Sequence, residues 1–387
     1  MHRYTRVLQI LQALFFNLVL LSLVALLPLM PAQAQEGPPG ITQHTVFPPF
    51  NPNAPACSKP PGLEHVLGYV QENEREFLEG VSHGLSQAAK DRGLEYRRVV
   101  VENDAAKAAE QVESFRAAKL GAVIGTSSNP AVISHSLQAF IWSGGFVGTI
   151  VPPPATLILN APQYATGKVL TDAAIAHINA KLGGKANVVL LTQDTMQFLT
   201  PRFDAMRDGL SNLPGVTIVA DISPEHVSTE DGFATMNTIL LANPDVDVVL
   251  GSDAVVLGAL KALRAAGKAR PDQFLGGIDG EPEAVAEIKK GNGPYKASIA
   301  LSSPVFGYAM GQFAADWLDG KSVPQGMDIQ PIALTSDNIE KYDADLADPG
   351  SVFRDPARRA TYLKMFGNIC YDTRDQYVNF PWSSEQK

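Results

Sequence analysis

Short apolar runs alternate with amphipathic segments along most of this chain. In the first part each run precedes a helical pattern, as in HVLGYV with 74–92, YRRVVV with 105–118 and GAVIG with 130–142. After GFVGTI and a long helical segment at 163–182, the rhythm resumes with ANVVLLT, VTIVAD, DVVLG, FLGGI and YKASIAL, with helices beginning at Pro201, Glu230, Asp253, Glu281 and Pro304. Short apolar strands that alternate with amphipathic helices indicate βαβ units, in which helices cover both faces of parallel sheets.

The number of strands predicts two sheets rather than one. About ten strands is a large number for a single twisted sheet, so two sheets of five or six are expected, with the break near the triple proline at 152–154. The fold class is therefore α/β, with two doubly wound parallel-sheet lobes. Residues 35–62 are dense in proline and predict an extended arm. The final segment, 343–387, leaves the rhythm and is interpreted as an appended arm with one short helix.

The first 34 residues predict an export signal. Arg3 and Arg6 precede the apolar run FFNLVLLSLVALLPLM, and Ala32-Gln33-Ala34 follows it. A positive region, an apolar region and an A-x-A site in this order are typical of a cleaved signal peptide. The alternative is an uncleaved membrane anchor, since the apolar run is long enough to span a bilayer.

An exported chain is exposed to conditions that permit disulfides, which bears on Cys57 and Cys370. The two cysteines lie near opposite ends of the mature chain and allow one intramolecular bond between the terminal arms. Two free thiols are the alternative. Neither cysteine is expected to act in catalysis.

Charge and motifs exclude several function classes. The formal net charge is −9 and no basic stripe is present, which argues against nucleic-acid binding. The chain contains no G-x-G-x-x-G opening a helix, no Walker loop, no G-x-S-x-G elbow and no H-E-x-x-H. His83 and His177 fall within predicted helices as ordinary helix-face residues. We therefore predict a binding protein without catalytic residues, cofactor or metal.

The stretch VVLGSDAVVLGALKALRAAG places Asp253 where an apolar strand passes into a helix. In an α/β sheet, side chains at a strand's carboxyl end face a cleft, which is where ligands bind. Asp253 could equally cap the helix that follows it. The pattern alone leaves both roles open.

Beyond these patterns, the chain resembles the periplasmic sugar-binding proteins of ABC transporters, of the ribose- and galactose-binding type. The likeness covers Leu63 to Tyr342 and is sharpest from LLANPDVDVVLGSDAVVLGALKALRAAG through GGIDGEPEAV. The N-P-D-V run, the D-x-x-x-x-G-A-L-x-A-L-x-x-A-G helix and the G-x-D-G-x-P-E loop occur in fixed order. FLEGVSHGLSQAAKDRGLEY is similar to the first helix of the family.

The resemblance implies a type I periplasmic binding protein fold, in which two lobes are joined by three chain crossings and close around a ligand. The crossings are expected near 160–162, 301–303 and 325–329. Lobe one is then formed by 63–161 plus 302–326, and lobe two by 162–301 plus 327–342.

The resemblance also implies ligand contacts at the strand ends. Asp279 matches an aspartate that accepts hydrogen bonds from sugar hydroxyls, and Arg202 an arginine that donates to sugar oxygens. Phe77 matches an aromatic that packs on the sugar ring, and Ser252 takes the place of a ligand-contacting asparagine. Asp253 is then interpreted as a structural helix cap at the cleft rim. The alternatives are a turn residue for Asp279, a helix-surface ion pair for Arg202 and a core residue for Phe77.

Several positions depart from the ribose-binding pattern. Ile150-Val151 stand where the family has an Asp-Arg pair, and Leu301 where it has a glutamine. Arg75 and Gly125 each replace an asparagine. These losses remove hydroxyl-reading groups, so a plain ribose would be left with unpaired hydroxyls. The expected ligand is a sugar derivative, a sugar acid or a smaller polyol-like molecule. Further wall residues are expected at Tyr164, Gln193, Phe198 and Phe233.

These features predict a monomeric periplasmic solute receptor that closes on a carbohydrate-like ligand and delivers it to an inner-membrane ABC permease. A receptor that partners a chemoreceptor or sensor kinase is the alternative. A secreted enzyme is a third class, against which the paucity of paired acid and base groups argues. The export signal and the lack of an amino-terminal helix-turn-helix exclude a related transcriptional repressor.

Overall fold

The computed structural model describes residues 47–126, 129–150, 154–334, 338–380 and 382–385. The signal peptide expected at 1–34 and the start of the proline-rich arm lie outside the described residues. Residues 37–387 form one compact unit. Among the described residues, no helix combines the length and the apolar character needed to cross a membrane.

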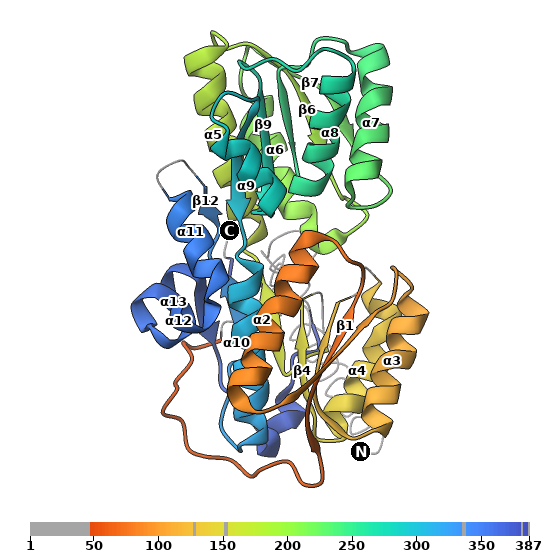
Figure 1. Cartoon of the computed structure of the whole chain (residues 1–387), viewed down its shortest axis with the longest axis vertical. Coiled ribbons are helices and arrows are strands. Elements are labelled where there is room, and N and C mark those ends of the chain that lie inside the picture. Colours follow the sequence, from red (N-terminus) through yellow and green to blue (C-terminus); the bar gives the residue numbers. More distant parts are fainter. Residues whose placement is uncertain (1–46, 127–128, 151–153, 335–337, 381, 386–387) are drawn as a thin grey trace, which may run out of the picture. The chain divides into compact units, whose positions relative to one another are not determined.

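The first lobe is built on a seven-stranded sheet of order β13-β11-β5-β4-β3-β1-β2 (Figure 1). Its strands are β1 (Glu64–Gln71), β2 (Glu95–Val100), β3 (Leu120–Gly125), β4 (Phe146–Thr149), β5 (Leu157–Asn160), β11 (Gly326–Ile329) and β13 (Leu363–Phe366). Its helices are α2 (Glu76–Arg92), α3 (Ala105–Ala117), α4 (Pro130–Trp142) and α10 (Ser303–Leu318). The pair α2 and α10 packs into one core cluster and the pair α3 and α4 into another, so that each pair covers one sheet face.

The second lobe is built on a six-stranded sheet of order β12-β10-β9-β8-β6-β7. Its strands are β6 (Ala186–Leu191), β7 (Val216–Ile222), β8 (Val248–Gly251), β9 (Phe274–Asp279), β10 (Tyr295–Ala300) and β12 (Ile332–Ala333). Its helices are α5 (Gln163–Lys181), α6 (Thr200–Ser211), α7 (Thr229–Ala242), α8 (Asp253–Ala265) and α9 (Pro282–Lys289). The strands pair in parallel except for β12, and the central ones are buried on both faces, which explains their continuous apolar runs.

The order of the described strands takes the chain between the two sheets four times. It leaves the first sheet after β5 and begins α5 at Gln163, and it returns after β10 to begin α10 at Ser303. The third passage lies between β11 and β12, at Gln330 and Pro331, and a fourth lies between β12 and β13, so the structure has one more passage than the three expected. The expected lobe boundary at 326/327 is therefore wrong, because β11 pairs in parallel with β5 and belongs wholly to the first sheet.

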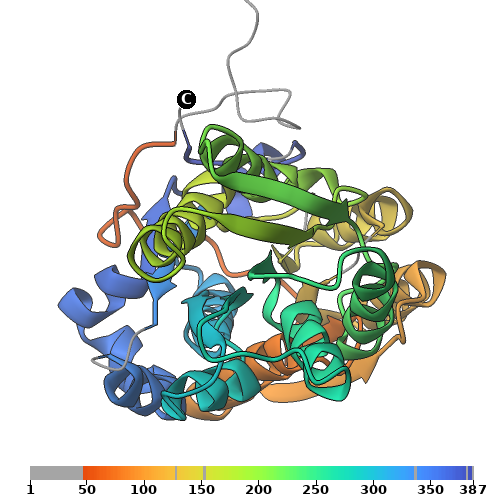
Figure 2. The ribbon, with the colours of Figure 1, turned by 90° about the horizontal axis from the view of Figure 1, so that it is seen from above.

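The expected description of 343–387 as an appended arm with one short helix is also wrong. The segment after β12 forms three helices, α11 (Ile339–Ala347), α12 (Pro349–Arg354) and α13 (Pro356–Tyr362), beside α10 (Figure 1 and Figure 2). Strand β13 then joins β11 as an antiparallel edge strand of the first sheet, and a 3-10 turn, η2 (Tyr371–Gln376), follows. This segment is thus integral to the first lobe.

A disulfide joins Cys57 to Cys370, whose Cα atoms are 6.2 Å apart. It fixes the segment that precedes β1 to the segment that follows β13. Pro49 forms an isolated bridge with Phe366, and the backbone N of Ser58 donates to Asp372 Oδ2 at 2.7 Å, so several contacts hold this arm against the first lobe.

Candidate functional site

A cavity of about 680 Å³ lies between the two lobes, at the carboxyl ends of their strands. Thr126 and Ile150 follow β3 and β4 of the first lobe, and Ser252 follows β8 of the second. This edge of a parallel sheet is where side chains and loops are free to meet a ligand. The position and size suit a small organic molecule, since such sites measure about 300–1,000 Å³.

Seven of the eight residues predicted as ligand contacts line this cavity. They are Arg75, Phe77, Ile150, Arg202, Ser252, Asp279 and Leu301. Gly125 does not line it, and its neighbour Thr126 does. A Cβ on Gly125 would point at Leu137 and Ile133 of α4. Because side chains alternate between the faces of a strand, residue 125 faces the core and residue 126 the cleft.

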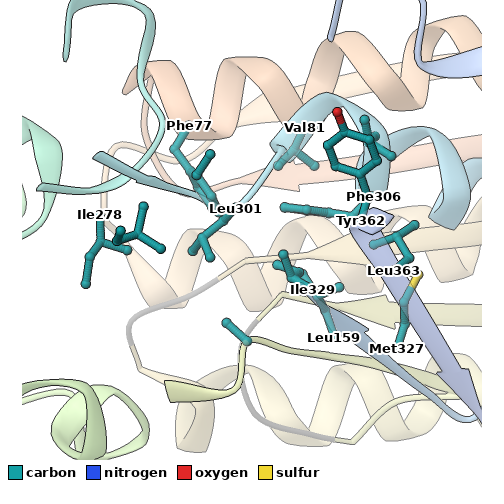
Figure 3. Packing of buried hydrophobic residues seen from close by; sticks show 14 of the residues in the cluster. Phe77, Val81, Leu159, Ile278, Leu301, Phe306, Met327, Ile329, Tyr362 and Leu363 are labelled. Atoms are coloured by element: carbon teal, nitrogen blue, oxygen red, sulfur yellow. The ribbon is translucent and has the colours of Figure 1, made fainter. Parts of the chain in front are cut away.

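The hinge side of the cavity is apolar. Leu301, Ile329 and Leu159 lie next to one another with Phe77 beyond Leu301 (Figure 3), and all four line the cavity. Leu159, Leu301 and Ile329 lie at three different chain passages and Phe77 lies on α2, so the hinge and the first lobe meet in one buried cluster.

Asp279 is the last residue of β9 and has an unusual backbone. Its φ of 129° lies in a region that side-chain-bearing residues rarely adopt. Arg75 Nη1 lies 3.4 Å from Asp279 Oδ2, which links the first lobe to the second across the cleft. Burial raises the pKa of Asp279, and the charges of Arg75 and Arg202 oppose that rise. Strain held at a buried charged residue in a cleft is typical of a functional position.

Arg75 also covers Phe77. The guanidinium carbon lies 4.7 Å from the centre of the Phe77 ring, and the ring packs against Phe306 at 5.7 Å. The stacking of guanidinium on an aromatic face is a favourable cation–π contact. The face of Phe77 that was expected to receive a sugar ring therefore carries Arg75 in this structure.

Arg202, in the first turn of α6, is only 3 % exposed. Its Nε donates to Gln163 Oε1 at 2.9 Å. Burial lowers its pKa, while the charge of Asp279 raises it. Within the described part of the chain, its terminal nitrogens have no hydrogen-bond acceptor, and the residue lines the cavity, so a ligand oxygen could accept from them. The alternative of a helix-surface ion pair for Arg202 has no support among the described residues, and the neighbouring Asp204 pairs with Arg207.

Ser252 and some of the expected wall residues line the cavity, and the other expected wall residues lie outside it. Ser252 Oγ donates to Gln193 Oε1 at 3.4 Å, and Phe198 lines the cavity directly. Tyr164 instead donates its hydroxyl to Asp208, and Phe233 lies on α7, partly exposed. Neither of these two is among the lining residues.

Asp253 has a structural role, but it neither caps its own helix nor lies at the rim. It is fully buried and accepts hydrogen bonds from Tyr295 Oη at 2.6 Å, Ser298 Oγ at 2.7 Å and the backbone N of Glu281 at 2.8 Å. These contacts fix β10 and the loop that follows Asp279. Burial raises the pKa of Asp253 to about 6, although the hydrogen bonds from Ser298 and Tyr295 oppose the rise.

Sequence reasoning missed Glu281, which lies two residues beyond Asp279. Its Oε1 is buried without a hydrogen-bond partner in the described structure and lies 3.9 Å from Arg75 Nη1. Burial and the charges of Asp279 and Asp253 raise its pKa to about 8. The only hint in the sequence was its place in the G-x-D-G-x-P-E loop.

Sequence reasoning also did not identify cavity residues at the end of the described chain. Trp382, Ser383 and Glu385 line the cavity although they lie far beyond the predicted lobes. The segment carries no periodic pattern, so no sequence signal placed it there.

One group of described residues brings together three side chains of the types that bind metals. Cys57, Cys370 and Asp372 place one ligand atom each within 4.8 Å of one another. Both sulfurs belong to the disulfide, so this group offers no thiolate to a metal.

Several known proteins share this architecture. A solute-binding protein of an ABC transporter from Bacillus halodurans C-125, solved with bound myo-inositol, has a TM-score of 0.64 at 20% identity and covers 73% of this chain and 98% of its own. One from Actinobacillus succinogenes 130z, solved with bound D-allose, has a TM-score of 0.63 at 19% identity, with 72% and 99% covered. These likenesses show the type I periplasmic binding protein fold.

Sequence comparison agrees with the fold. The ribose import binding protein of Bacillus subtilis (strain 168) is 28% identical over 277 residues, which is 67% of this chain and 84% of that protein. The D-apiose import binding protein of Actinobacillus succinogenes is 26% identical over 219 residues, 54% of this chain and 67% of that protein. Residues 66–322 match the family described as "Periplasmic binding protein domain". The chain therefore belongs to the periplasmic binding protein domain family.

Proposed function

We propose that this chain is the solute-binding protein of an ABC importer and that its ligand is a sugar or a small sugar-derived molecule. The observation that carries this proposal is the cavity of about 680 Å³ between the lobes, in which Asp279 and Arg202 provide an acceptor and a donor beside apolar walls. The protein is exported, works in the periplasm as a monomer and passes its ligand to an inner-membrane permease. Relatives named as sugar import binding proteins support the same role.

The charges in the cavity support a ligand that is acidic or carries a carbonyl group. Arg75 already has Asp279 as a partner, whereas the terminal nitrogens of Arg202 have no acceptor in the described structure. Ile150 and Leu301 are apolar and offer nothing to sugar hydroxyls. A sugar acid would place its carboxylate on the arginines and fewer hydroxyls against these walls. Plain ribose would lose about 1 kcal/mol for each hydroxyl left unpaired.

A thermal-shift screen of the chain from Gln35 onward tests the function. The panel contains pentoses, hexoses, polyols, sugar acids and small aromatic acids. A ligand at a hundred times its dissociation constant stabilises the fold by about 2.7 kcal/mol, which gives a clear shift. We expect a sugar acid or sugar derivative to give the largest shift and Asp279→Ala to abolish it.

The control is Asp245→Ala, at an exposed carboxylate outside the cavity, which should keep the full shift. If ribose gives the largest shift, the interpretation of Ile150 and Leu301 is wrong. If no carbohydrate shifts the melt, the ligand belongs to another chemical class.

A further inference from the structure

The last described residues connect the two lobes. Val378 pairs with Ala155 through two backbone hydrogen bonds of 2.9 Å, and Gln325 Nε2 donates to the carbonyl of Gln376 at 2.9 Å. Both partners, Ala155 and Gln325, adjoin strands of the first sheet. The segment therefore starts on the first lobe.

Trp382 fixes the segment there. Its ring lies 5.5 Å from the rings of Phe47 and Phe366, and it is only 5 % exposed. A Cβ on Gly326 would approach the indole to 2.8 Å, so the ring rests directly on the backbone of β11. Only glycine at 326 leaves room for this packing, which buries a large apolar surface at the hinge.

Three residues later the segment reaches the second lobe. Glu385 Oε1 accepts from the backbone N of Ala165 at 2.8 Å, and Oε2 accepts from the backbone N of Tyr164 at 3.2 Å. Both amides lie in the first turn of α5, where backbone donors lack partners within the helix. The helix begins after Pro162, whose side chain cannot accept a hydrogen bond. Glu385 supplies the missing cap, and its charge is favourable at the positive end of the helix.

The path between these two attachments runs along the hinge and the ligand cavity. Trp382, Ser383 and Glu385 all line the cavity. Asn160, the last residue of β5, donates its Nδ2 to Asp328 Oδ1 of the adjoining strand β11 at 2.8 Å. Ser384 and Asn160 each form a side-chain hydrogen bond with Asp328, and these bonds partly offset the rise that burial causes in the pKa of Asp328. Ser384 therefore lies beside the hinge.

We propose that Trp382–Glu385 form a strap that fixes the second lobe to the first and restricts the opening of the hinge. Trp382 is its anchor on the first lobe and Glu385 is its clasp on α5. A rotation that carries α5 away from the first sheet has to break the two bonds of Glu385 or pull Trp382 off Gly326. The strap also forms one wall of the cavity, so its release changes the space that a ligand meets. This role depends on the hinge and not on the identity of the ligand proposed above.

Distance measurements between spin labels on the ligand-free protein test the strap. The labels are placed at Lys107→Cys on α3 and Lys185→Cys before β6, both exposed positions in different lobes. We expect a narrow distance distribution in the native background and a broader one, extending to longer distances, in Glu385→Ala. Glu340→Ala, at an exposed carboxylate on α11, is the matched control and should leave the distribution unchanged.

Amide hydrogen exchange tests whether Glu385→Ala loses the two hydrogen bonds to α5 and whether the variant is folded. Exchange at Tyr164 and Ala165 should rise about five- to tenfold in Glu385→Ala, as expected for the loss of a helix cap, while the cores of both sheets stay protected. Faster exchange at these amides together with an unchanged distance distribution would contradict the proposed strap. Glu385 would then only cap α5 and would not restrict the hinge. A Trp382→Ala variant should broaden the distribution in the same way, and a failure to do so would equally contradict the proposal. Neither readout involves a ligand, so a negative result leaves the proposed function standing.

Discussion

At the scale of single residues, the site is built around one strained loop. Asp279 holds a φ of 129° and Gly280 follows with a φ of 73°. Such a backbone costs of order 1–3 kcal/mol and persists only where the surroundings hold it. Here Asp253 provides that support through its hydrogen bond to the backbone of Glu281. A buried carboxylate outside the cavity thus positions the carboxylate inside it.

Glu281 makes the stability of this loop dependent on pH. Its pKa is raised to about 8 in the folded chain, above the ordinary value of 4.5. Between these values the folded state binds one more proton than the unfolded state, so the free energy of unfolding falls as the pH rises, by up to about 1.4 kcal/mol per pH unit. We expect Glu281→Gln to flatten this decline between pH 5 and 8, as measured by urea unfolding. If the free energy of unfolding changes with pH in the same way in the native protein and in Glu281→Gln, Glu281 is ionised in the folded state at a lower pH than its burial implies.

The sequence identified residues at strand ends well and residues in irregular segments poorly. The family resemblance pointed to Asp279, Ser252 and Ile150, which lie at strand ends, and parallel strands bring their carboxyl ends to one edge. Gly125 was misplaced by one position, because the side-chain direction along a strand depends on where the alternation begins. The hydrogen bonds of Asp253 join β8, β9 and β10, and no local pattern in the chain encodes such a contact.

At the scale of elements, the long helices and most strands followed from periodicity, whereas β5, β11, β12 and β13 did not. Runs such as GAVIG and ANVVLL are buried on both faces, so their apolar character is continuous and easily seen. Strands β5, β11, β12 and β13 have only two to four residues. They exist because of pairing partners far away in the chain, as for β11 on β5, which a local pattern cannot reveal.

The packing of α5 on α6 positions Arg202. A Cβ at Gly167 of α5 would lie 1.9 Å from the carbonyl oxygen of Arg202, so the two helices meet there without room for a side chain. We expect Gly167→Ala to push α6 outward, to destabilise the fold by about 1–3 kcal/mol and to weaken ligand binding. Gly293→Ala is the control, because a Cβ there would meet only Glu287 Oε2 at 3.9 Å. Equal melting temperatures for the two variants would contradict the close packing.

At the scale of the whole compact unit, three kinds of connection hold the lobes together. The chain passages are covalent, Arg75 bridges to Asp279, and Glu76 accepts from the backbone N of Glu283 at 3.3 Å. Arg75 and Glu76 stand at the start of α2, which therefore acts as the contact between the first lobe and the loop of Asp279. The resemblance seen in the sequence implied the passages, whereas these noncovalent contacts depend on how far the lobes are closed.

We expect Arg75 to influence which kind of ligand the cleft accepts. It occupies the face of Phe77 and pairs with Asp279, so a neutral sugar that needs both residues has to displace it. An acidic ligand gains a charged partner instead. Since a hydrogen bond to a charged group contributes about 1.5–3 kcal/mol, we expect Arg75→Ala to weaken the binding of a sugar acid about tenfold or more, as measured by calorimetry. Arg97→Ala, on the exposed surface of β2 with Glu95 as its partner, should leave the affinity unchanged. Tighter binding of the ligand to Arg75→Ala would instead show that Arg75 competes with it, and the ligand would then be a neutral sugar.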